Sequence, residues 1–392
     1  MTRGWSLLTD RALRRAAFAI TTVALSAPLA GQAPLPRTRG VETLRISGNA
    51  EDLSNVAWLV GFPDGRIAAG LPVEGVVRWF GPDGKKLGDF GRRGEGPGEF
   101  RAPLQGGRAV DTLWVLDRQL GRLTFVRPGA FPLRGFSSLP SPSEFNGSLG
   151  GKNPVAGSVT GVLAGRRFLF HVSELDPAVL RGADRVSRFA ITDSIGRLQS
   201  VLPWADSSGR CSVPYTSGKT VGSVGVMFCA QPLLRVSPTG DRIVRVTADN
   251  SSATTSTFAV AVYAPTGALL SKAAFRVPAV PIPKRVADSI QAGMVEHARS
   301  PEARAARKKA KIPAAYPPVI EAVIADDGGI WLSTPGGDSL RTWLVLDARG
   351  TRRGTVLLPK QFFLSTVLKG SAIGREYDED GFVDIVRYRV AP

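Results

Sequence analysis

Residues 59–90 read LVGFPDGRIAAGLPVEGVVRWFGPDGKKLGDF, and they form the clearest repeat unit of the chain. Four short apolar runs alternate with residues that favour turns, at residues 59–62, 67–71, 76–80 and 87–90. Two of the turns contain Asp-Gly, at Asp64-Gly65 and Asp83-Gly84. Asp-Gly between apolar runs indicates a hairpin, because such a turn needs a positive φ and Gly adopts it at little cost. The stretch therefore predicts four short strands in meander order.

A glycine turn between two short apolar runs recurs along the chain, at Gly84, Gly129, Gly196, Gly267 and Gly350. Further strand candidates surround these turns, within residues 112–136, 155–202, 233–275 and 319–358. The spacing between the glycines grows from 45 to 83 residues, so later repeats are expected to carry longer loops. Repeated four-stranded sheets with tight turns are typical of the blades of a β-propeller. Five blades are thus predicted.

The two ends of the chain predict a sixth blade. After Phe363 three strand candidates remain, at residues 366–368, 372–377 and 382–390, which is one strand short of a blade. Residues 41–46 form a strand candidate that has no hairpin partner nearby. Joining them closes the ring and removes unpaired strand edges. We predict an all-β fold, a six-bladed β-propeller closed by the N-terminal strand, as a single domain over residues 34–392.

One helical insertion is predicted at about residues 284–312. Its middle is rich in Ala, Arg, Lys and Glu, which favour one or two helices. The insertion is strongly basic and carries a net charge of +5. We expect it to be a solvated excursion that packs across one face of the ring. Docking of an anionic partner is the alternative.

Residues 1–33 are interpreted as a signal peptide. Four arginines and one aspartate precede a charge-free run at residues 16–30, and small residues follow this run up to Ala33. This run is shorter than the roughly 20 residues that span a bilayer. We predict cleavage near Ala30 to Ala33, with a retained anchor as the alternative. The mature chain would then have no transmembrane segment and would be exported, to the periplasm or the extracellular space.

Composition and charge narrow the function classes. With 392 residues, 43% hydrophobic, 44 Gly and 29 Pro, the chain is too apolar to be disordered and too rich in turn formers to be mostly helical. The net charge of +17 includes +3 from residues 1–33, which leaves +14 for the remainder. Outside the cytoplasm such a charge meets lipid phosphates and acidic polysaccharides, so no nucleic acid partner is expected. A solvated surface of scattered Arg residues is the favoured explanation of the charge.

Cys211 and Cys229 are the only cysteines. In an oxidising compartment a single pair is expected to form a disulfide. The bridge would close 18 residues and contribute about 3 kcal/mol in the chain-entropy model. We predict that it staples an otherwise irregular stretch rich in Gly and Ser.

Residues 90–103, FGRRGEGPGEFRAP, resemble the Gly-rich link between the blades of NHL-type, TolB-like six-bladed propellers. The runs LWVLD at residues 113–117 and GRLTF at residues 121–125 resemble the strands that follow this link. The resemblance implies the fold and leaves the activity open, because similar rings include scaffolds, ligand binders, a lyase and lactonase-like hydrolases. The link itself is explained as a structural turn. Contact of Arg92, Arg93 and Arg101 with an anion is the alternative, and these are weak binding candidates.

The sequence contains no convincing catalytic centre. Its two histidines, His171 and His297, lie in a strand candidate and in the charged helical stretch, without a metal-ligand or triad pattern. SGKT at residues 217–220 lacks the first glycine of a phosphate-binding loop, and DEDG at residues 378–381 is explained as a hairpin turn rather than a calcium loop. We therefore predict no catalytic residues, no metal ligands and no cofactor.

The predicted function is that of a monomeric binding module for an envelope protein, a glycan or a small ligand, without catalysis of its own. The alternative is a metal-dependent hydrolase or lyase with a carboxylate-lined central channel that binds a divalent cation. Such an enzyme would gather acids from the ends of different strands, and the candidates are Glu74, Asp117, Asp176, Asp241 and Asp327.

Overall fold

The structure is a computed structural model that describes residues 35–129, 133, 136–140, 144–145, 155–174, 188–202, 211–218, 220–337 and 339–390. The chain divides into two units, Met1–Leu35 and Pro36–Pro392, and the second unit holds every described helix and strand. The predicted signal peptide lies outside the described residues.

The first three blades are four-stranded antiparallel meanders, and all their bounds follow. Blade 1 consists of Trp58–Gly61 (β3), Ile67–Leu71 (β4), Val76–Phe80 (β5) and Lys86–Phe90 (β6). Blade 2 consists of Pro103–Ala109 (β7), Thr112–Asp117 (β8), Arg122–Val126 (β9) and Phe136–Pro140 (β10). Blade 3 consists of Val155–Leu163 (β12), Arg167–Glu174 (β13), Arg188–Thr192 (β14) and Leu198–Leu202 (β15), with Glu144–Phe145 (β11) paired to β12.

The remaining blades follow in chain order. Blade 4 consists of Leu233–Val236 (β18), Ile243–Asp249 (β19), Thr255–Tyr263 (β20) and Leu269–Pro278 (β21). Blade 5 consists of Glu321–Ile324 (β22), Ile330–Thr334 (β23), Leu340–Leu346 (β24) and Arg352–Pro359 (β25). Blade 6 consists of Phe363–Leu368 (β26), Ser371–Tyr377 (β27) and Val383–Arg389 (β28), completed by Val41–Ile46 (β2) from the start of the chain.

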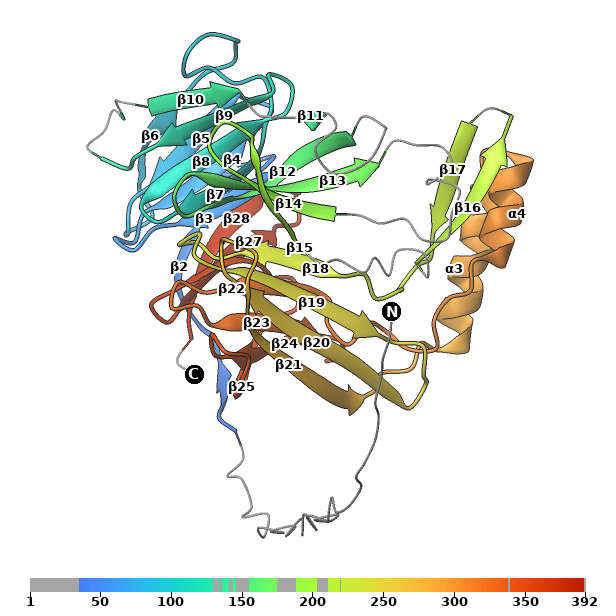
Figure 1. Ribbon diagram of the computed structural model, residues 1–392. Coiled ribbons are helices and arrows are strands. Elements are labelled where there is room, and N and C mark those ends of the chain that lie inside the picture. Colours follow the sequence, from blue (N-terminus) through green and yellow to red (C-terminus); the bar gives the residue numbers. More distant parts are fainter. Residues whose placement is uncertain are drawn as a thin grey trace, which may run out of the picture. The chain divides into compact units, whose positions relative to one another are not determined.

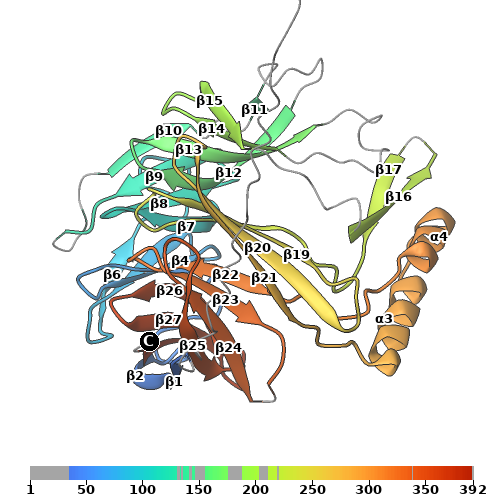
Figure 2. The same cartoon turned by 60° about the horizontal axis from the view of Figure 1, so that its bottom comes forward.

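The six sheets form a closed ring. The first strand of each blade contacts the first strand of the next, in the order β3, β7, β12, β18, β22, β26 and back to β3. Figure 2 shows the blades following one another in chain order from blue through green and yellow to red. The prediction of an all-β six-bladed propeller is therefore confirmed. We call the end of the ring where the first strands begin the upper face, and the end where they finish the lower face.

Apolar side chains fill the space between neighbouring blades. Trp79 and Leu113 belong to a fully buried cluster between blades 1 and 2, and Trp343 and Val386 to one between blades 5 and 6. Burying a large apolar side chain stabilises a fold by about 1.5–3 kcal/mol. Each blade thus needs its neighbours, which explains why a ring of small sheets behaves as one unit.

The five marker glycines all occupy the same place in their blades, between the third and fourth strands. Gly84, Gly196, Gly267 and Gly350 have φ between 82° and 89°, a conformation that favours glycine. Gly129 follows β9 in blade 2. Blade 6 has no such glycine, because its fourth strand is β2 and no turn joins β28 to it. This explains why six blades show only five markers.

The N-terminal strap, residues 36–46, closes the ring and joins two blades. β2 pairs antiparallel with β28, which confirms the predicted closure. Before it, Arg37–Arg39 (β1) pairs parallel with β25 as a fifth strand of blade 5, a contact that the sequence did not predict. Gly40 donates its amide hydrogen to Leu357 O (2.9 Å) as the chain crosses between the blades.

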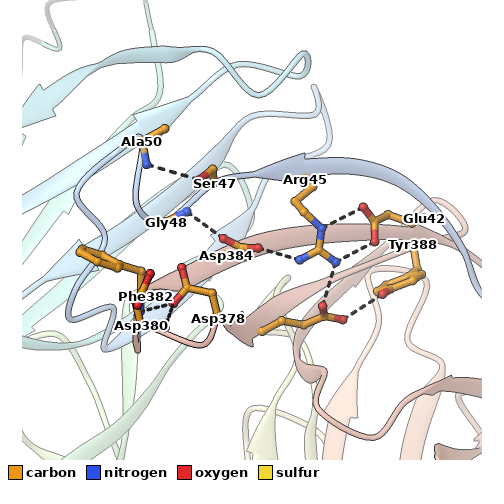
Figure 3. A network of polar contacts seen from close by, with 11 residues as sticks. Glu42, Arg45, Ser47, Gly48, Ala50, Asp378, Asp380, Phe382, Asp384 and Tyr388 are labelled. Carbon is orange, nitrogen blue, oxygen red and sulfur yellow. Dashed lines mark hydrogen bonds and ion pairs between the residues drawn. The ribbon is translucent and has the colours of Figure 1, made fainter.

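A polar network fastens the strap to blade 6 (Figure 3). Arg45 on β2 donates to both carboxylate oxygens of Glu42, to Asp384 Oδ2 (2.7 Å) and to Glu376 Oε2 (2.8 Å). Tyr388 donates its hydroxyl hydrogen to Glu376 Oε1 (2.9 Å), and Asp384 also accepts from Gly48 N. Glu42, and then Glu376 and Asp384, raise the pKa of Arg45 against the opposing effect of burial. Burial and the bond to Glu376 raise the pKa of Tyr388.

The insertion unit consists of a hairpin and two helices. Its elements are Ser212–Ser217 (β16), Thr220–Gly225 (β17), Lys284–Glu296 (α3) and Pro301–Lys309 (α4). The start of α4 is capped, because Ser300 Oγ accepts a hydrogen bond from Ala303 N (3.1 Å) and Pro301 occupies the first turn. Basic residues in the last turn interact favourably with the helix dipole. The Cys211–Cys229 disulfide joins the two ends of the hairpin, which confirms the predicted pairing.

Two expectations about this region were wrong. Residues 212–225 form a regular hairpin, not an irregular stretch. The helices do not pack across a face of the ring: α4 contacts β16, β17 and α3, and Figure 1 shows this group beside the blades. The reason is that Ala303 and Ala306 give α4 a small apolar face, and this face is buried against the hairpin.

Asn250, in the turn after β19, attaches the insertion unit to blade 4. Its side chain is buried, donates from Nδ2 to Phe228 O and Ala315 O (both 2.7 Å) and accepts from Ala230 N (3.2 Å). Phe228 also packs edge-on against Tyr316. One amide therefore connects the segment after the hairpin to the segment after the helices.

Candidate ligand channel

A hollow of about 560 Å³ runs through the centre of the ring. The first strands of all six blades line it, together with Trp114 from β8. In the ring, the neighbours of blade 4 are blades 3 and 5, and blade 1 lies opposite. The size is within the about 300–1,000 Å³ that is typical of small-molecule sites.

The lower end of this channel is tied together by contacts between turns. Val110 N donates to Pro238 O (3.0 Å), which joins blade 2 to blade 4, and Ala164 N donates to Gly240 O (2.8 Å). Arg108, which is almost fully buried, forms an ion pair with Asp326 of blade 5. Since Arg108 and Pro238 also line the channel, we expect a ligand to enter from the upper face.

Arg235 supplies a positive charge on the channel wall. It lies on β18 and donates from Nε to Ala322 O of blade 5 (2.9 Å) and from Nη1 to Leu234 O (2.8 Å). Nη2 has no hydrogen-bond partner in the part of the chain that the structure describes. The side chain is exposed to the channel. Desolvation inside the ring lowers the pKa of the guanidinium, against the opposing charge of Glu321.

Glu321 does not neutralise Arg235 by itself. Its Oε2 lies 3.2 Å from Nη1 of Arg341 on β24, so its charge is shared with a second cation. Glu321 is the one carboxylate among the described channel-lining residues, which include no His or Cys. Together with the pair formed by Arg108 and Asp326, this arrangement leaves the channel with an excess positive charge.

The wall formed by blades 1 and 2 is apolar and aromatic. Trp58 lies against Gly106, where an added Cβ would come within 2.5 Å of the indole, and it donates from Nε1 to Pro103 O (2.8 Å). Trp114 lies equally close to Gly107. Gln105 also lines the channel, and its Oε1 is buried without a partner among the described atoms. The channel thus combines an aromatic wall, an unused acceptor and a cation.

A second hollow of about 900 Å³ lies at the turns of blades 5 and 6. Two of its carboxylates accept hydrogen bonds from backbone amides in turns. Asp347 accepts from Arg349 N and Thr351 N, and Asp327 accepts from Gly329 N. Burial would raise the pKa of Asp347, but these bonds and Arg353 lower it. Asp327 and Asp347 are therefore occupied by the fold, and we take the central channel as the candidate site.

The three weak binding candidates of the Gly-rich link are engaged in contacts within the chain. Arg92 Nε lies 2.6 Å from Glu99 Oε1, and Arg101 pairs with Glu95. Arg93 donates to Val73 O (3.2 Å). The structure therefore places the three guanidinium groups on separate partners and does not bring them together.

The acid candidates of the alternative function do not converge either. Asp117 is fully buried and accepts from the backbone amides of Arg101, Ala102, Gln119 and Leu120, which fixes the Gly-rich link. Glu74 and Asp117 lie at turns of the upper face, whereas Asp241 and Asp327 lie at turns of the lower face. Asp176 lies outside the described residues. No group of three or more His, Cys, Asp or Glu side chains suited to a metal ion occurs in the described ranges.

The remaining motifs also have structural explanations. His171 packs against the ring of Phe189 (5.1 Å between centroids), and His297 Nδ1 lies 2.8 Å from Gly293 O at the end of α3. SGKT forms the end of the β16–β17 hairpin, with Lys219 outside the described residues. In DEDG, Asp378 accepts from Asp380 N and Phe382 N, so the motif is the β27–β28 turn (Figure 3).

Comparison with known proteins supports a fold likeness only. No family model matches the chain, and no curated protein does, so the NHL-type resemblance stays a prediction. Among solved structures, a putative exported protein from Bacteroides fragilis is 10% identical (TM-score 0.46; 91% of this chain, 99% of that one). A DUF4221 member from Bacteroides vulgatus is 9% identical, with a TM-score of 0.44 over 89% of this chain and 97% of that one. Virginiamycin B lyase from Staphylococcus aureus is 8% identical, with a TM-score of 0.40 over 90% of this chain and 98% of that one. None of these likenesses carries an argument about function.

Sequence reasoning missed the channel residues Arg235, Gln105 and Glu321. A signal was present for Arg235, because a lone Arg in the run Leu233-Leu234-Arg235-Val236 interrupts an otherwise apolar strand. Its position beside the channel depends on the closed ring.

Within the described ranges, no helix has the length and apolar character that a membrane span requires.

Proposed function

We propose that the protein is an exported, monomeric β-propeller that binds an anionic small molecule in its central channel and has no catalysis of its own. The observation that carries this proposal is the Arg235 guanidinium on the channel wall, with Nη2 unpaired among the described atoms. Export is supported by the N-terminal pattern and by the Cys211–Cys229 disulfide, since disulfides persist in oxidising compartments.

The channel walls define the class of ligand. A carboxylate or phosphate would pair with the guanidinium and accept a charge-assisted hydrogen bond from Nη2. A planar apolar body would contact Trp58 and Trp114 on the opposite wall. A hydroxyl or amino group on that body would donate to Gln105 Oε1, which otherwise remains buried without a partner. We therefore expect an aromatic acid with one hydrogen-bond donor.

The lining favours binding over hydrolysis. General acid–base chemistry needs a titratable side chain that is positioned to exchange a proton with the substrate. The one described carboxylate of the lining, Glu321, is held by Arg341, and none of the four described candidate acids, Glu74, Asp117, Asp241 and Asp327, lines the channel.

Calorimetric titration with hydroxynaphthoate tests this proposal, with naphthol as the uncharged control ligand. Replacing Arg235 with Gln is expected to weaken hydroxynaphthoate binding by about 10- to 100-fold, the range for hydrogen bonds to charged groups, and to leave naphthol binding unchanged. Gln105→Leu is expected to abolish the preference for hydroxynaphthoate over naphthoate.

Arg276→Gln is the matched control variant, because Arg276 is exposed on β21 and does not line the channel. It removes the same charge and should bind like the wild type. Equal affinity of wild type and a folded Arg235→Gln, checked by thermal melting, would overturn the proposal, as would naphthol binding as tightly as hydroxynaphthoate.

A further inference from the structure

The insertion unit presents a basic surface that the channel does not use. Residues 299–311 contain six basic side chains and one acidic side chain. Five of the six are exposed and have no ion-pair partner in the described part of the chain, and we call them the α4 cations: Arg299, Arg304, Lys308, Lys309 and Lys311. The sixth, Arg307, is tied to Met294 O of α3.

Two of the α4 cations, Arg304 and Lys308, point away from the protein. Ala303, Ala306 and Ala310 are buried, so they mark the inward face of the helix. Arg304 and Lys308 are one turn apart on the opposite face. Glu302, the only acid of the segment, accepts from Ser217 Oγ on the hairpin (3.1 Å) and so faces the other way.

α3 lies beside α4 and provides an internal contrast. It has two basic residues, Lys284 and Arg285, and two acidic residues, Asp288 and Glu296, so its charge is balanced. Lys284 Nζ also pairs with Asp288 (2.6 Å). Positive charge is therefore concentrated on one of two neighbouring helices and not spread over the whole insertion.

The surface is held in place rather than loosely attached. α4 packs on a hairpin whose ends are joined by the Cys211–Cys229 disulfide, and buried Asn250 connects this hairpin to blade 4. The backbone of such a support loses little additional freedom on binding, which lowers the cost of docking.

We propose that the α4 cations dock the protein electrostatically on an anionic phospholipid membrane. The convex outward face of a helix matches a planar array of charges better than a single extended polymer, which binds in grooves. Arg304 and Lys308, on that outward face, can then lie within one Debye length of the surface, about 8 Å at physiological ionic strength. No apolar side chain is needed, so the adsorption is peripheral and sensitive to salt.

Co-sedimentation with vesicles of phosphatidylcholine, with and without phosphatidylglycerol, tests this proposal on the full mature chain. Binding is expected only to vesicles that contain phosphatidylglycerol, and it should decrease steeply as salt is added. The triple variant Arg304→Gln, Lys308→Gln, Lys311→Gln should bind these vesicles about 100-fold more weakly, since each basic side chain near such a surface contributes about fivefold.

The matched control is Lys85→Gln, Arg118→Gln, Arg352→Gln, which removes three exposed charges from blades 1, 2 and 5. It should bind like the wild type, and both variants should melt like the wild type. Equal loss in both variants would show that net charge alone is responsible and would overturn the proposal. Binding to an anionic polysaccharide such as heparin, without binding to the vesicles, would also overturn it.

Discussion

The N-terminal strap and the insertion unit are both additions to the basic meander, and they are attached in opposite ways. The strap, residues 36–46, is built into the ladders of blades 5 and 6, and Ile46 lies in the core between blades 6 and 1. The insertion unit contributes no strand to any blade; Asn250 connects it to blade 4, and the disulfide joins the two ends of its hairpin. The comparison indicates that closure and recognition are carried by separate parts of the chain.

The largest difference is expected when each addition is removed. Deletion of residues 36–46 exposes the edge of β28 and breaks the ring, so it should remove most of the about 5–15 kcal/mol that is typical of a domain. Deletion of residues 286–311 leaves all six blades intact and should lower the free energy of unfolding far less. Urea unfolding of both deletion proteins measures this. Similar losses in the two would contradict the comparison.

A single substitution in the strap should also have a large effect. Arg45→Met leaves Glu376 buried without its cation, although Tyr388 still donates to it. We expect a loss of about 3 kcal/mol, at the low end for a broken buried pair, because Arg45 itself is about a third exposed. Arg39→Met is the control, since it removes the same charge from the exposed β1. Equal urea midpoints for the two variants would refute the role of the network.

Removal of the Asn250 amide should loosen the insertion unit locally. Asn250→Ala leaves Ala230 N, Phe228 O and Ala315 O without their partner, at a cost of about 2 kcal/mol. Hydrogen exchange should become faster in β16, β17 and α4 and stay unchanged in blades 1 and 6. Ser251→Ala, an exposed change in the same turn, should have no effect. Uniformly faster exchange across the ring would mean that the unit is part of the core.

The smallest effect concerns the pH dependence of stability at Tyr388, in the network that fastens the strap. Because the pKa of Tyr388 is raised, the folded state keeps this proton at a pH where the unfolded state, with an ordinary pKa of about 10, loses it. The contribution to stability is complete below pH 10 and decreases as the pH rises further. Tyr388→Phe should therefore be about 1 kcal/mol less stable than the wild type near neutral pH, and this gap should shrink above pH 10. A gap that does not change with pH, in urea unfolding, would contradict the assignment.

The architecture could be predicted from sequence because its signals are local. Four of the marker glycines adopt positive φ, and this requirement is visible in a short stretch of residues. β7 was missed because its run PLQGGRA has no apolar alternation; Gly106 and Gly107 are small since Trp58 and Trp114 pack on them, which is a tertiary cause. The β16–β17 hairpin was missed for a similar reason, because α4 and the disulfide stabilise it from distant parts of the chain.

The candidate site was harder to predict than the fold. Arg92, Arg93 and Arg101 are close in sequence, yet each has a different partner in the structure. Arg235, Gln105 and Trp58 come from blades 4, 2 and 1, and they line one channel only because the ring is closed. Residues that meet through closure are separated by a long stretch of chain, and no local pattern links them.

The pairing of β2 with β28 has a consequence for the order of assembly. Residues 41–46 are synthesised long before residues 383–389, so the seam is the contact that must form last, with the greatest possible loop between its two sides. Until then both strands present free edges that could pair with another molecule. A ring sealed in this way gains a cooperative final step, and its greatest risk of aggregation falls just before that step.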